Sequence, residues 1–235
     1  ITEETRLLKE GAAVDYDLEG LAQRAGGGFW AVSEGNADDR PNLLIEVAAD
    51  GSVVQEITLP PELVANAVRH GLEGVAVTGS GAAETIHVAF QREWGDDPAG
   101  FVKIGRYTPA DDSWDFVYYP LDTAPEGAWV GLSEIVALDE AGRFAVLERD
   151  NQQGPAATVK RIYEVDLTAT SDQGLAYPVL TKTLARDLLP DLQAGNGWVP
   201  DKVEGMAVAA DDQLYVVTDN DGLDDAVGET YFLRL

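Results

Sequence analysis

The chain has 235 residues, of which 45% are apolar and 25% charged, so it can bury a sizeable core and is not expected to be disordered. It carries 42 Asp and Glu against 16 Lys and Arg, a formal net charge of −26 at pH 7. A surface of this sign repels phosphate backbones and anionic lipids, so we expect no nucleic-acid partner. It favours cations instead.

The sequence also lacks the residues and runs that mark several other classes of protein. There are no cysteines, which excludes disulfides, thiolate metal sites and a cysteine nucleophile. No apolar run reaches the roughly 18 residues of a membrane span. The chain begins at Ile1 without a basic and apolar leader, so we expect a processed or excised piece with no membrane span.

A short motif recurs along the chain. Three copies have Glu-Gly after Leu or Val, around Glu19, Glu73 and Glu204, and a fourth, Leu-Ser-Glu at 132–134, has the acid displaced by one position. The copies start at residues 18, 72, 132 and 203, with spacings of 54, 60 and 71 residues. Such spacings are typical of the blades of a β-propeller.

In chain order, each copy predicts antiparallel strands rich in β-branched and aromatic residues. After each motif strand, further strands are expected at 29–32, 42–47 and 53–59, then 86–89, 101–107 and 114–119, then 144–147, 161–166 and 179–184, then 214–217 and 230–235. Short helical insertions are expected at 60–68 and 185–193, where prolines precede or interrupt apolar residues.

These elements predict an all-β fold, a β-propeller of four-stranded antiparallel blades with four blades visible. One domain, 1–235, would hold blades at about 13–60, 67–121, 128–185 and 198–235. The last blade lacks a fourth strand. Residues 1–12, through a strand at 6–9, would close the ring, or the chain is the C-terminal portion of a larger propeller whose upstream blades lie elsewhere or on a companion chain.

In a propeller, the start of the first strand and the end of the second strand of every blade lie at the same mouth. The first-strand starts bring Asp17, Glu19, His70, Glu73, Ser133, Glu134, Lys202 and Glu204 there. The second-strand ends add Glu34, Asn36, Gln91, Arg92, Glu93, Glu148, Arg149, Asp150, Asp219, Asn220 and Asp221.

So many carboxylates require protonation, pairing with Lys or Arg, or a hard cation bound through oxygen. Because the chain has only two histidines, Ca²⁺ is expected rather than zinc or iron. The loop at 219–225 is the densest candidate, although it lacks the twelfth-position Glu of an EF-hand. Two alternatives stay open: the loop is a solvated turn, and the repeated Glu hydrogen-bonds backbone amides.

The repeated motifs, together with Val-Ser-Glu-Gly at 32–35, Leu-Glu-Arg-Asp at 147–150 and Val-Thr-Asp-Asn-Asp at 217–221, resemble the phytase-like family, also described as the esterase-like domain of phytase. The resemblance runs from about residue 17 to the end. It implies a bacterial, exported (periplasmic or secreted) β-propeller with phosphoesterase activity and further blades upstream. The matching acidic-motif positions are Glu19, Glu34, Glu73, Glu134, Glu148, Arg149, Asp150, Glu204, Asp219 and Asp221.

The leading hypothesis is a calcium-dependent hydrolase of anionic phosphate esters. Glu19, Glu73, Glu204, Asp219 and Asp221 would hold the metal, Arg149 and Lys202 would bind phosphate oxygens, and Glu148 would act as general base. Asp17, Glu34, Glu134, Asp150 and Asn220 are further candidates at the mouth. The alternatives are a non-catalytic, calcium-stabilised propeller that binds a ligand or partner, and a metal-dependent lactonase or esterase.

Overall fold

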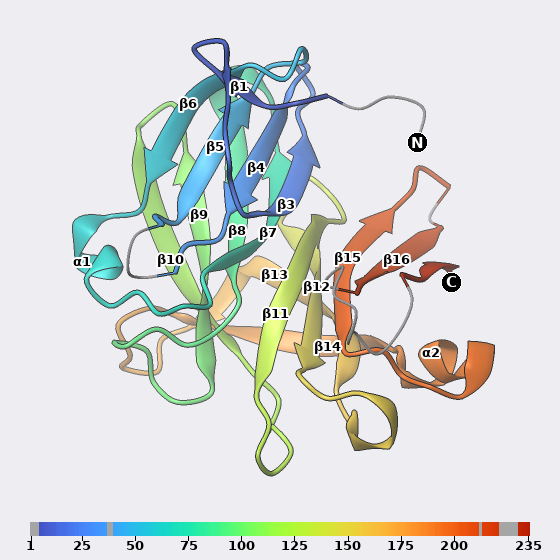
Figure 1. Cartoon of the computed structure of the whole chain (residues 1–235). Helices are drawn as coiled ribbons and strands as arrows, with labels where there is room; N and C mark the ends of the chain where they lie inside the picture. The colour runs from blue at the N-terminus through green and yellow to red at the C-terminus, as the bar shows by residue number, and fades with distance from the viewer. Residues whose placement is uncertain (1–4, 37–39, 212, 221–229) are drawn as a thin grey trace.

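The computed structural model describes residues 5–36, 40–211, 213–220 and 230–235. Its strands form four antiparallel units in chain order (Figure 1). Unit 1 holds β3 (Leu18–Gln23), β4 (Phe29–Ser33), β5 (Leu43–Val47) and β6 (Val53–Thr58). Unit 2 holds β7 (Leu72–Thr78), β8 (Thr85–Phe90), β9 (Phe101–Thr108) and β10 (Ser113–Pro120). Unit 3 holds β11 (Val130–Ala137), β12 (Arg143–Asp150), β13 (Lys160–Ser171) and β14 (Val179–Asp187), and unit 4 holds β15 (Lys202–Val208), β16 (Leu214–Asp219) and β17 (Phe232–Arg234).

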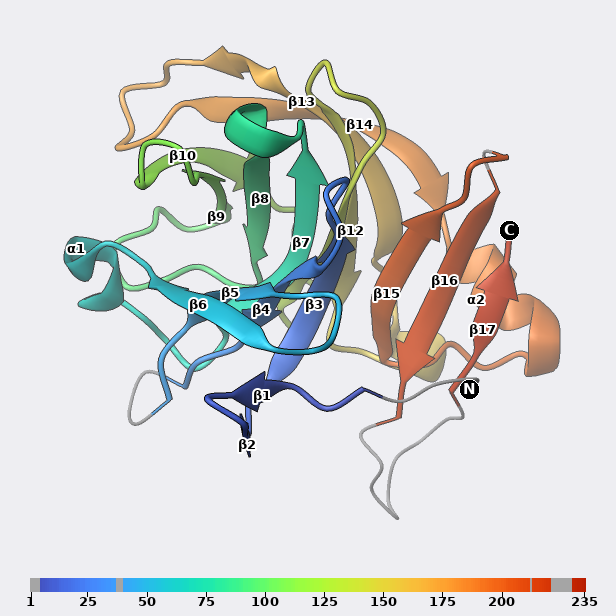
Figure 2. The same ribbon diagram turned by 90° about the horizontal axis from the view of Figure 1, so that it is seen from above.

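The mostly β character and the repeated hairpin units are confirmed, but four separate four-stranded blades are not what the structure shows. Units 2 and 3 form one eight-stranded sheet, because β10 and β14 meet in a parallel pairing at Tyr118 and Val179. Unit 4 has three strands within the described residues. The sheets fan around the inner strands β3, β7, β11 and β15 (Figure 2).

Among the described residues, the strand expected at 6–9 pairs with its own chain neighbours and with unit 1, and no pairing with unit 4 is seen there. The short strand β1 (Leu8–Lys9) pairs with β2 (Ala12–Ala13), and Leu8 bridges Ser52 at the outer end of unit 1. The physical reason is apolar burial, since Leu7 and Tyr16 pack on the outer face of unit 1 over a buried cluster. The residues of that cluster are Ala31, Leu43, Ile45 and Val47.

Helical content is small, as expected. The helix α1 (Pro61–Val64) follows unit 1, and α2 (Leu189–Asn196) begins later than predicted because β14 continues to Asp187. Two single 3₁₀ turns lie at Gly81–Ala83 and Gly154–Ala156. Within the described ranges, no helix is both long and apolar enough to cross a membrane.

The core lies between successive units. Trp30, Leu44 and Val88 belong to the cluster between units 1 and 2. The cluster between units 2 and 3 includes Leu132, Phe144 and Tyr119. The cluster between units 3 and 4 includes Leu147, Val203 and Met206. Each apolar face is thereby buried against the next unit, which fixes how the inner strands stand side by side.

The repeated motif is a β-bulge in every inner strand. The pairing register shifts between Leu18 and Gly20 in β3, and at the equivalent motif positions of β7, β11 and β15. The Gly of the motif lets neighbouring inner strands touch through their backbones: a Cβ added at Gly74 would lie 2.5 Å from the amide nitrogen of Ile135. Because a bulge re-aims the side chains beside it, the motif turns its polar residues toward one end of the molecule.

Candidate active site at the acidic mouth

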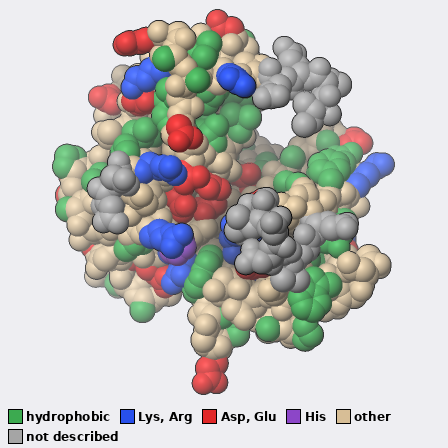
Figure 3. All heavy atoms as spheres, viewed as in Figure 1, with side chains coloured by type: hydrophobic (Ala, Val, Ile, Leu, Met, Phe, Trp, Pro, Cys, Tyr) green, Lys and Arg blue, Asp and Glu red, His purple; other side chains and the backbone are tan. Residues whose placement is uncertain are grey.

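Polar residues at the bulges line one cavity of about 640 Å³, at the end of the molecule where the inner strands begin. Glu19, Glu73 and Glu204 line it from three different strands. Asp17 and Glu34 from unit 1, Asp201 just before β15 and Asp219 from unit 4 complete the acidic lining. In the space-filling view, acidic side chains gather in a hollow near the centre of this face, with basic side chains beside them (Figure 3).

Three of these carboxylates form a tight group. Asp17, Glu19 and Glu34 each offer an oxygen atom within 4.8 Å of the others. Arg40 donates a hydrogen bond to Asp17, and the amide of Gly71 donates to Glu34 Oε1 at 2.9 Å. Glu19 lines the cavity beside them. Oxygen ligands at this spacing suit a hard divalent cation such as Ca²⁺.

Burial and the mutual repulsion of these negative charges raise the pKa values of the carboxyl groups at the cavity. Partial burial, followed by the charges of Glu34, Glu204 and Asp17, raises the pKa of Glu19 to about 7. Burial also raises the pKa of Glu34, and it raises that of Glu73 well above the usual range. In the absence of a cation, Glu19 therefore holds its proton up to about neutral pH, and Glu34 and Glu73 release theirs at higher pH than free carboxyl groups do.

The opposite wall of the same cavity is basic and aromatic. The guanidinium of Arg149 lies 5.2 Å from the centre of the Trp129 ring, and that of Arg92, which does not line the cavity, lies 4.6 Å from the same ring. His70 packs on the same indole at 5.4 Å between ring centres, and Arg69 precedes it in the lining. The cavity thus has a carboxylate side and a guanidinium side.

Arg149 links the two sides. Its Nη2 donates to Glu204 Oε1 at 2.6 Å, and its Nε donates to Ser133 Oγ at 2.9 Å. Glu73 is held in turn by the amide of Gln91, which donates to its Oε1. Lys202 lies 3.7 Å from Asp219 at the edge of the cavity.

Most of the predicted site residues meet in this cavity. Those that line it are Asp17, Glu19, Glu34, Glu73, Arg149, Lys202, Glu204 and Asp219. Asn220 adjoins Asp219 but is not part of the lining, and the predicted ligand Asp221 lies outside the described residues.

Glu148 does not lie at the mouth, which corrects its expected placement there. It is fully buried on the other side of β12 from Arg149. Its oxygens accept hydrogen bonds from the Tyr119 hydroxyl, the Asp122 amide and Lys182 Nζ, each at 2.6 Å. Both carboxylate oxygens of Glu148 are hydrogen-bonded to protein groups. The residue therefore belongs to an ion-pair network and has no access to the cavity.

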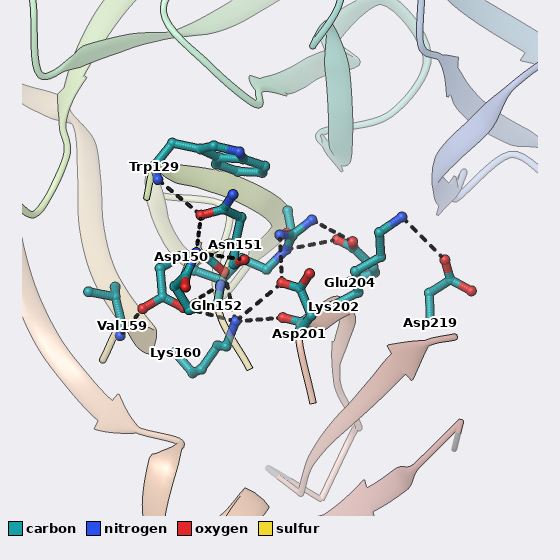
Figure 4. A network of polar contacts seen from close by, with 12 residues as sticks. Trp129, Asp150, Asn151, Gln152, Val159, Lys160, Asp201, Lys202, Glu204 and Asp219 are labelled. Atoms are coloured by element: carbon teal, nitrogen blue, oxygen red, sulfur yellow. Dashed lines mark hydrogen bonds and ion pairs between the residues drawn. The ribbon is translucent and has the colours of Figure 1, made fainter. Parts of the chain in front are cut away.

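Asp150 and Lys160 form a second buried pair behind the cavity, 3.0 Å apart and both fully buried (Figure 4). Asp150 also accepts from the amides of Thr158 and Val159 at 2.7 and 2.9 Å. Lys160 Nζ in turn donates to the backbone carbonyls of Asp150 and Asp201. The hydrogen bonds of Asp150 therefore hold the loop after β12 in place, and Asp150 does not line the cavity.

Glu134 takes the structural role that had been left open for the repeated acid. Its carboxylate accepts from its neighbour's amide, Ile135, at 2.9 Å, and the amides of Val75 and Met206 also hydrogen-bond to it. These three amides belong to β11, β7 and β15, so the side chain connects three inner strands. Burial outweighs these bonds and raises the pKa of Glu134 to about 8.

The basic wall contains residues that sequence reasoning overlooked. Neither Arg69 nor Trp129 was among the candidate site residues. Arg69 stands immediately before His70 and the second motif, so its position in sequence was a usable signal. Trp129 carried no such signal, because its role depends on the arginines that stack on it.

Comparison with known proteins places the chain in a family. One solved structure, a crystal structure of a protein from Lactobacillus plantarum, resembles it with a TM-score of 0.46 and 10% sequence identity over 86% of this chain and 48% of that one. The chain thus spans about half the length of that protein, and no curated protein matches its sequence. The model of the phytase-like family, described as "Esterase-like activity of phytase", matches residues 1–222, and the chain belongs to this family.

Proposed function

We propose that the acidic mouth is the active site of a calcium-dependent hydrolase that acts on phosphate esters. The observation that carries the proposal is the pairing of two walls in one cavity: the carboxylates Asp17, Glu19 and Glu34 share it with a wall that includes Arg69 and Arg149. A cation site beside a guanidinium cluster suits an ester with a negatively charged group.

The family description supports the hydrolase part of this proposal, and the charge of the protein supports the metal part. A chain with a net charge of −26 repels an anionic ester unless local positive charge offsets it. Calcium, when bound, supplies such charge beside the ester and activates water. Asp17, Glu19 and Glu34 fit the metal because all three present oxygen donors and because the proton on Glu19 is weakly enough held to be displaced at neutral pH.

The other cavity residues have roles that follow from their surroundings. Arg69 and Arg149 would hold the phosphate oxygens, with Trp129 fixing the plane of the Arg149 guanidinium group. Glu73, whose pKa burial raises well above the usual range, would donate a proton to the departing alcohol. Glu204 orients Arg149, and Lys202 with Asp219 closes the rim. An exported location stays a prediction from the family resemblance.

The decisive experiment measures release of p-nitrophenol from p-nitrophenyl phosphate and from p-nitrophenyl acetate, in EDTA and in calcium. We expect calcium-dependent hydrolysis of the phosphate ester. The Glu34→Gln variant should lose at least tenfold in kcat/KM, whereas Glu62→Gln, an exposed acid on α1, should match the unaltered protein.

The other outcomes select other functions. Turnover of the acetate alone would replace the proposal by a carboxylic-ester hydrolase, the second candidate, which the words "esterase-like" in the family description favour. Thermal stabilisation by calcium without turnover of either ester would indicate a non-catalytic, ligand-binding protein.

A further inference from the structure

The cavity at the acidic mouth keeps an excess of negative charge after its own cations are counted. Its acidic side chains are Asp17, Glu19, Glu34, Glu73, Asp201, Glu204 and Asp219, and its basic ones are Arg69, Arg149 and Lys202. His70 adds no charge at neutral pH, because burial and the neighbouring arginines lower its pKa. A bound calcium ion offsets part of this excess, and the lining stays negative even with Glu73 protonated.

The three basic side chains are not equally available to a substrate. Arg149 is 3% exposed and is held by Glu204 at 2.6 Å. Lys202 lies 3.7 Å from Asp219 and points toward it (Figure 4). Arg69 is exposed and forms no ion pair within the described ranges, although its positive charge partly offsets the effect of burial on the pKa of Glu34. One guanidinium group therefore remains for an incoming anion, besides any bound cation.

This charge balance distinguishes two classes of phosphate ester. A phosphate monoester carries about 1.5 to 2 negative charges at pH 7, because its second ionisation has a pKa of about 6. A phosphate diester has no second ionisable oxygen and carries a single charge. Each additional negative charge is repelled by the acids of the lining, so the mouth favours the diester.

The apolar parts of the lining also suit a diester, which has two organic groups. Leu18 lies between Asp17 and Glu19 in the sequence and is 48% exposed. Trp129 belongs to the basic wall and is only partly buried. Each wall of the cavity thus offers an apolar surface, and the phosphate group would lie between the two.

One buried polar atom of the lining marks a place for the departing alcohol. Gln91 is 6% exposed and lines the cavity, and its amide nitrogen donates to Glu73. Its Oε1 is buried and has no hydrogen-bond partner among the residues that the structure describes. An alcohol that receives a proton from Glu73 can donate its hydroxyl hydrogen to this oxygen.

We propose that the acidic mouth hydrolyses phosphate diesters in preference to monoesters and releases the monoester as its product. This inference rests on the proposed function and narrows its class of substrate. The oxygen of water forms a bond to phosphorus while one ester P–O bond breaks. Glu73 gives its proton to the departing alcohol oxygen and regains the proton that water loses. The monoester product carries more negative charge than the substrate, so the acidic lining repels it.

The test compares bis(p-nitrophenyl) phosphate with p-nitrophenyl phosphate in calcium at pH 7.5. We expect kcat/KM to be roughly tenfold or more higher for the diester. Release of p-nitrophenol from the diester should slow after one equivalent, because the monoester that accumulates is the poorer substrate.

Asp219→Asn tests the contribution of charge. It removes one exposed carboxylate from the lining, so kcat/KM for the monoester should rise about threefold or more relative to that for the diester. Asp115→Asn is the matched control, because Asp115 is also exposed and paired with a basic residue, Arg106, but lies outside the mouth. This control should leave the ratio of the two kcat/KM values unchanged.

A binding measurement gives a readout that does not depend on turnover. Phenylphosphonate and its methyl monoester differ by one ionisable oxygen, and isothermal titration calorimetry in calcium at pH 8 compares their affinities. We expect the methyl ester, which carries one charge, to bind roughly tenfold or more tightly than phenylphosphonate.

The outcomes separate this inference from the proposed function. Equal or faster turnover of the monoester, or tighter binding of phenylphosphonate, would overturn the preference for diesters and leave a calcium-dependent phosphate-ester hydrolase standing. Turnover of neither phosphate ester would overturn the proposed function and the diesterase activity with it.

Discussion

Arg149 on β12 and Glu204 on β15 form an ion pair with 2.6 Å between Nη2 and Oε1, and this pair joins units 3 and 4 at the acidic mouth. It also explains why the copy of the motif at 132–134 has its acid displaced by one position. Ser133 stands where the other copies have Glu, and its hydroxyl accepts from Arg149 Nε. A Glu at that place would crowd Arg149 between two carboxylates.

Replacing Arg149 by Met should destabilise the protein strongly. The Arg149 side chain is 3% exposed, and its removal leaves Glu204 without its partner beside Glu73. We expect a loss of about 3 kcal/mol in the free energy of unfolding, measured by urea denaturation in EDTA.

The control is Arg143→Met, which removes an exposed arginine paired with Asp139 and Glu164. Because Arg143 is exposed, that change should cost much less stability than Arg149→Met. Equal losses in the two variants would show that the Arg149–Glu204 pair has no special role in joining the units.

The glycine of the motif is predicted to be required for the close approach of the inner strands. In Gly74→Ala, the new Cβ would lie 2.5 Å from the Ile135 amide nitrogen and 2.6 Å from the Glu134 Cα, both backbone atoms. Backbone atoms cannot move aside cheaply, so we expect a loss of about 2 kcal/mol or more in stability.

Gly26→Ala makes the same change in the β3–β4 turn, where a Cβ meets no atom within 4 Å. Thermal melting should place this variant within a few degrees of the unaltered protein. A Gly74→Ala variant that melts at the same temperature would contradict the backbone packing of β7 on β11.

The repeated motif, the hairpin strands and the mouth that gathers the acids could be predicted because they depend on local patterns. Strand pairs such as β8–β9 and β12–β13 follow from β-branched runs separated by turns. The joining of units 2 and 3 through Tyr118 and Val179 could not be predicted, since it depends on the mutual position of two outer strands.

The misplacement of Glu148 has a different origin. Successive side chains of a strand face opposite ways, so residues 148 and 149 cannot both point into the cavity. Arg149 does, and Glu148 and Asp150 point away. Applying this alternation to β12 at the level of the sequence would have separated Arg149, on the cavity side, from Glu148 and Asp150 on the other side. At the motifs themselves alternation fails, because each carries a bulge that the sequence does not reveal.

Glu148 is accordingly predicted to stabilise the fold without taking part in chemistry at the mouth. Glu148→Gln weakens its contact with Lys182, whose Nζ also lies 2.7 Å from Asp122 and 4.1 Å from the Tyr163 ring. We expect a loss of about 2 kcal/mol in urea denaturation, with kcat/KM of the folded variant within about twofold.

The matched variant is Glu164→Gln, which alters an exposed partner of Arg143 and should leave stability within about 0.5 kcal/mol. A hundredfold fall in kcat in a stably folded Glu148→Gln protein would instead support the general-base role predicted from the sequence.

Stability in the absence of calcium should fall as the pH rises above about 5. The folded-state pKa is about 7 for Glu19 and about 8 for Glu134, whereas the ordinary value for both is 4.5. Between these limits the folded protein holds more protons than the unfolded chain, so the free energy of unfolding decreases with increasing pH. Melting temperatures in EDTA between pH 5 and pH 9 measure this slope.

Glu134→Gln isolates the contribution of one group. Glutamine keeps an oxygen that accepts from the Ile135 amide but cannot lose a proton. Whatever constant cost its NH2 group incurs beside the Val75 and Met206 amides, the variant should gain a few degrees relative to the unaltered protein as the pH rises from 5 to 9. Glu62→Gln, on the exposed side of α1, should keep a constant offset over the same range. A constant offset for Glu134→Gln as well would mean that Glu134 is ionised throughout.

Calcium should remove the part of the slope due to Glu19 and leave the part due to Glu134, because Glu19 belongs to the carboxylate group at the cavity and Glu134 is held by the backbone of the inner strands.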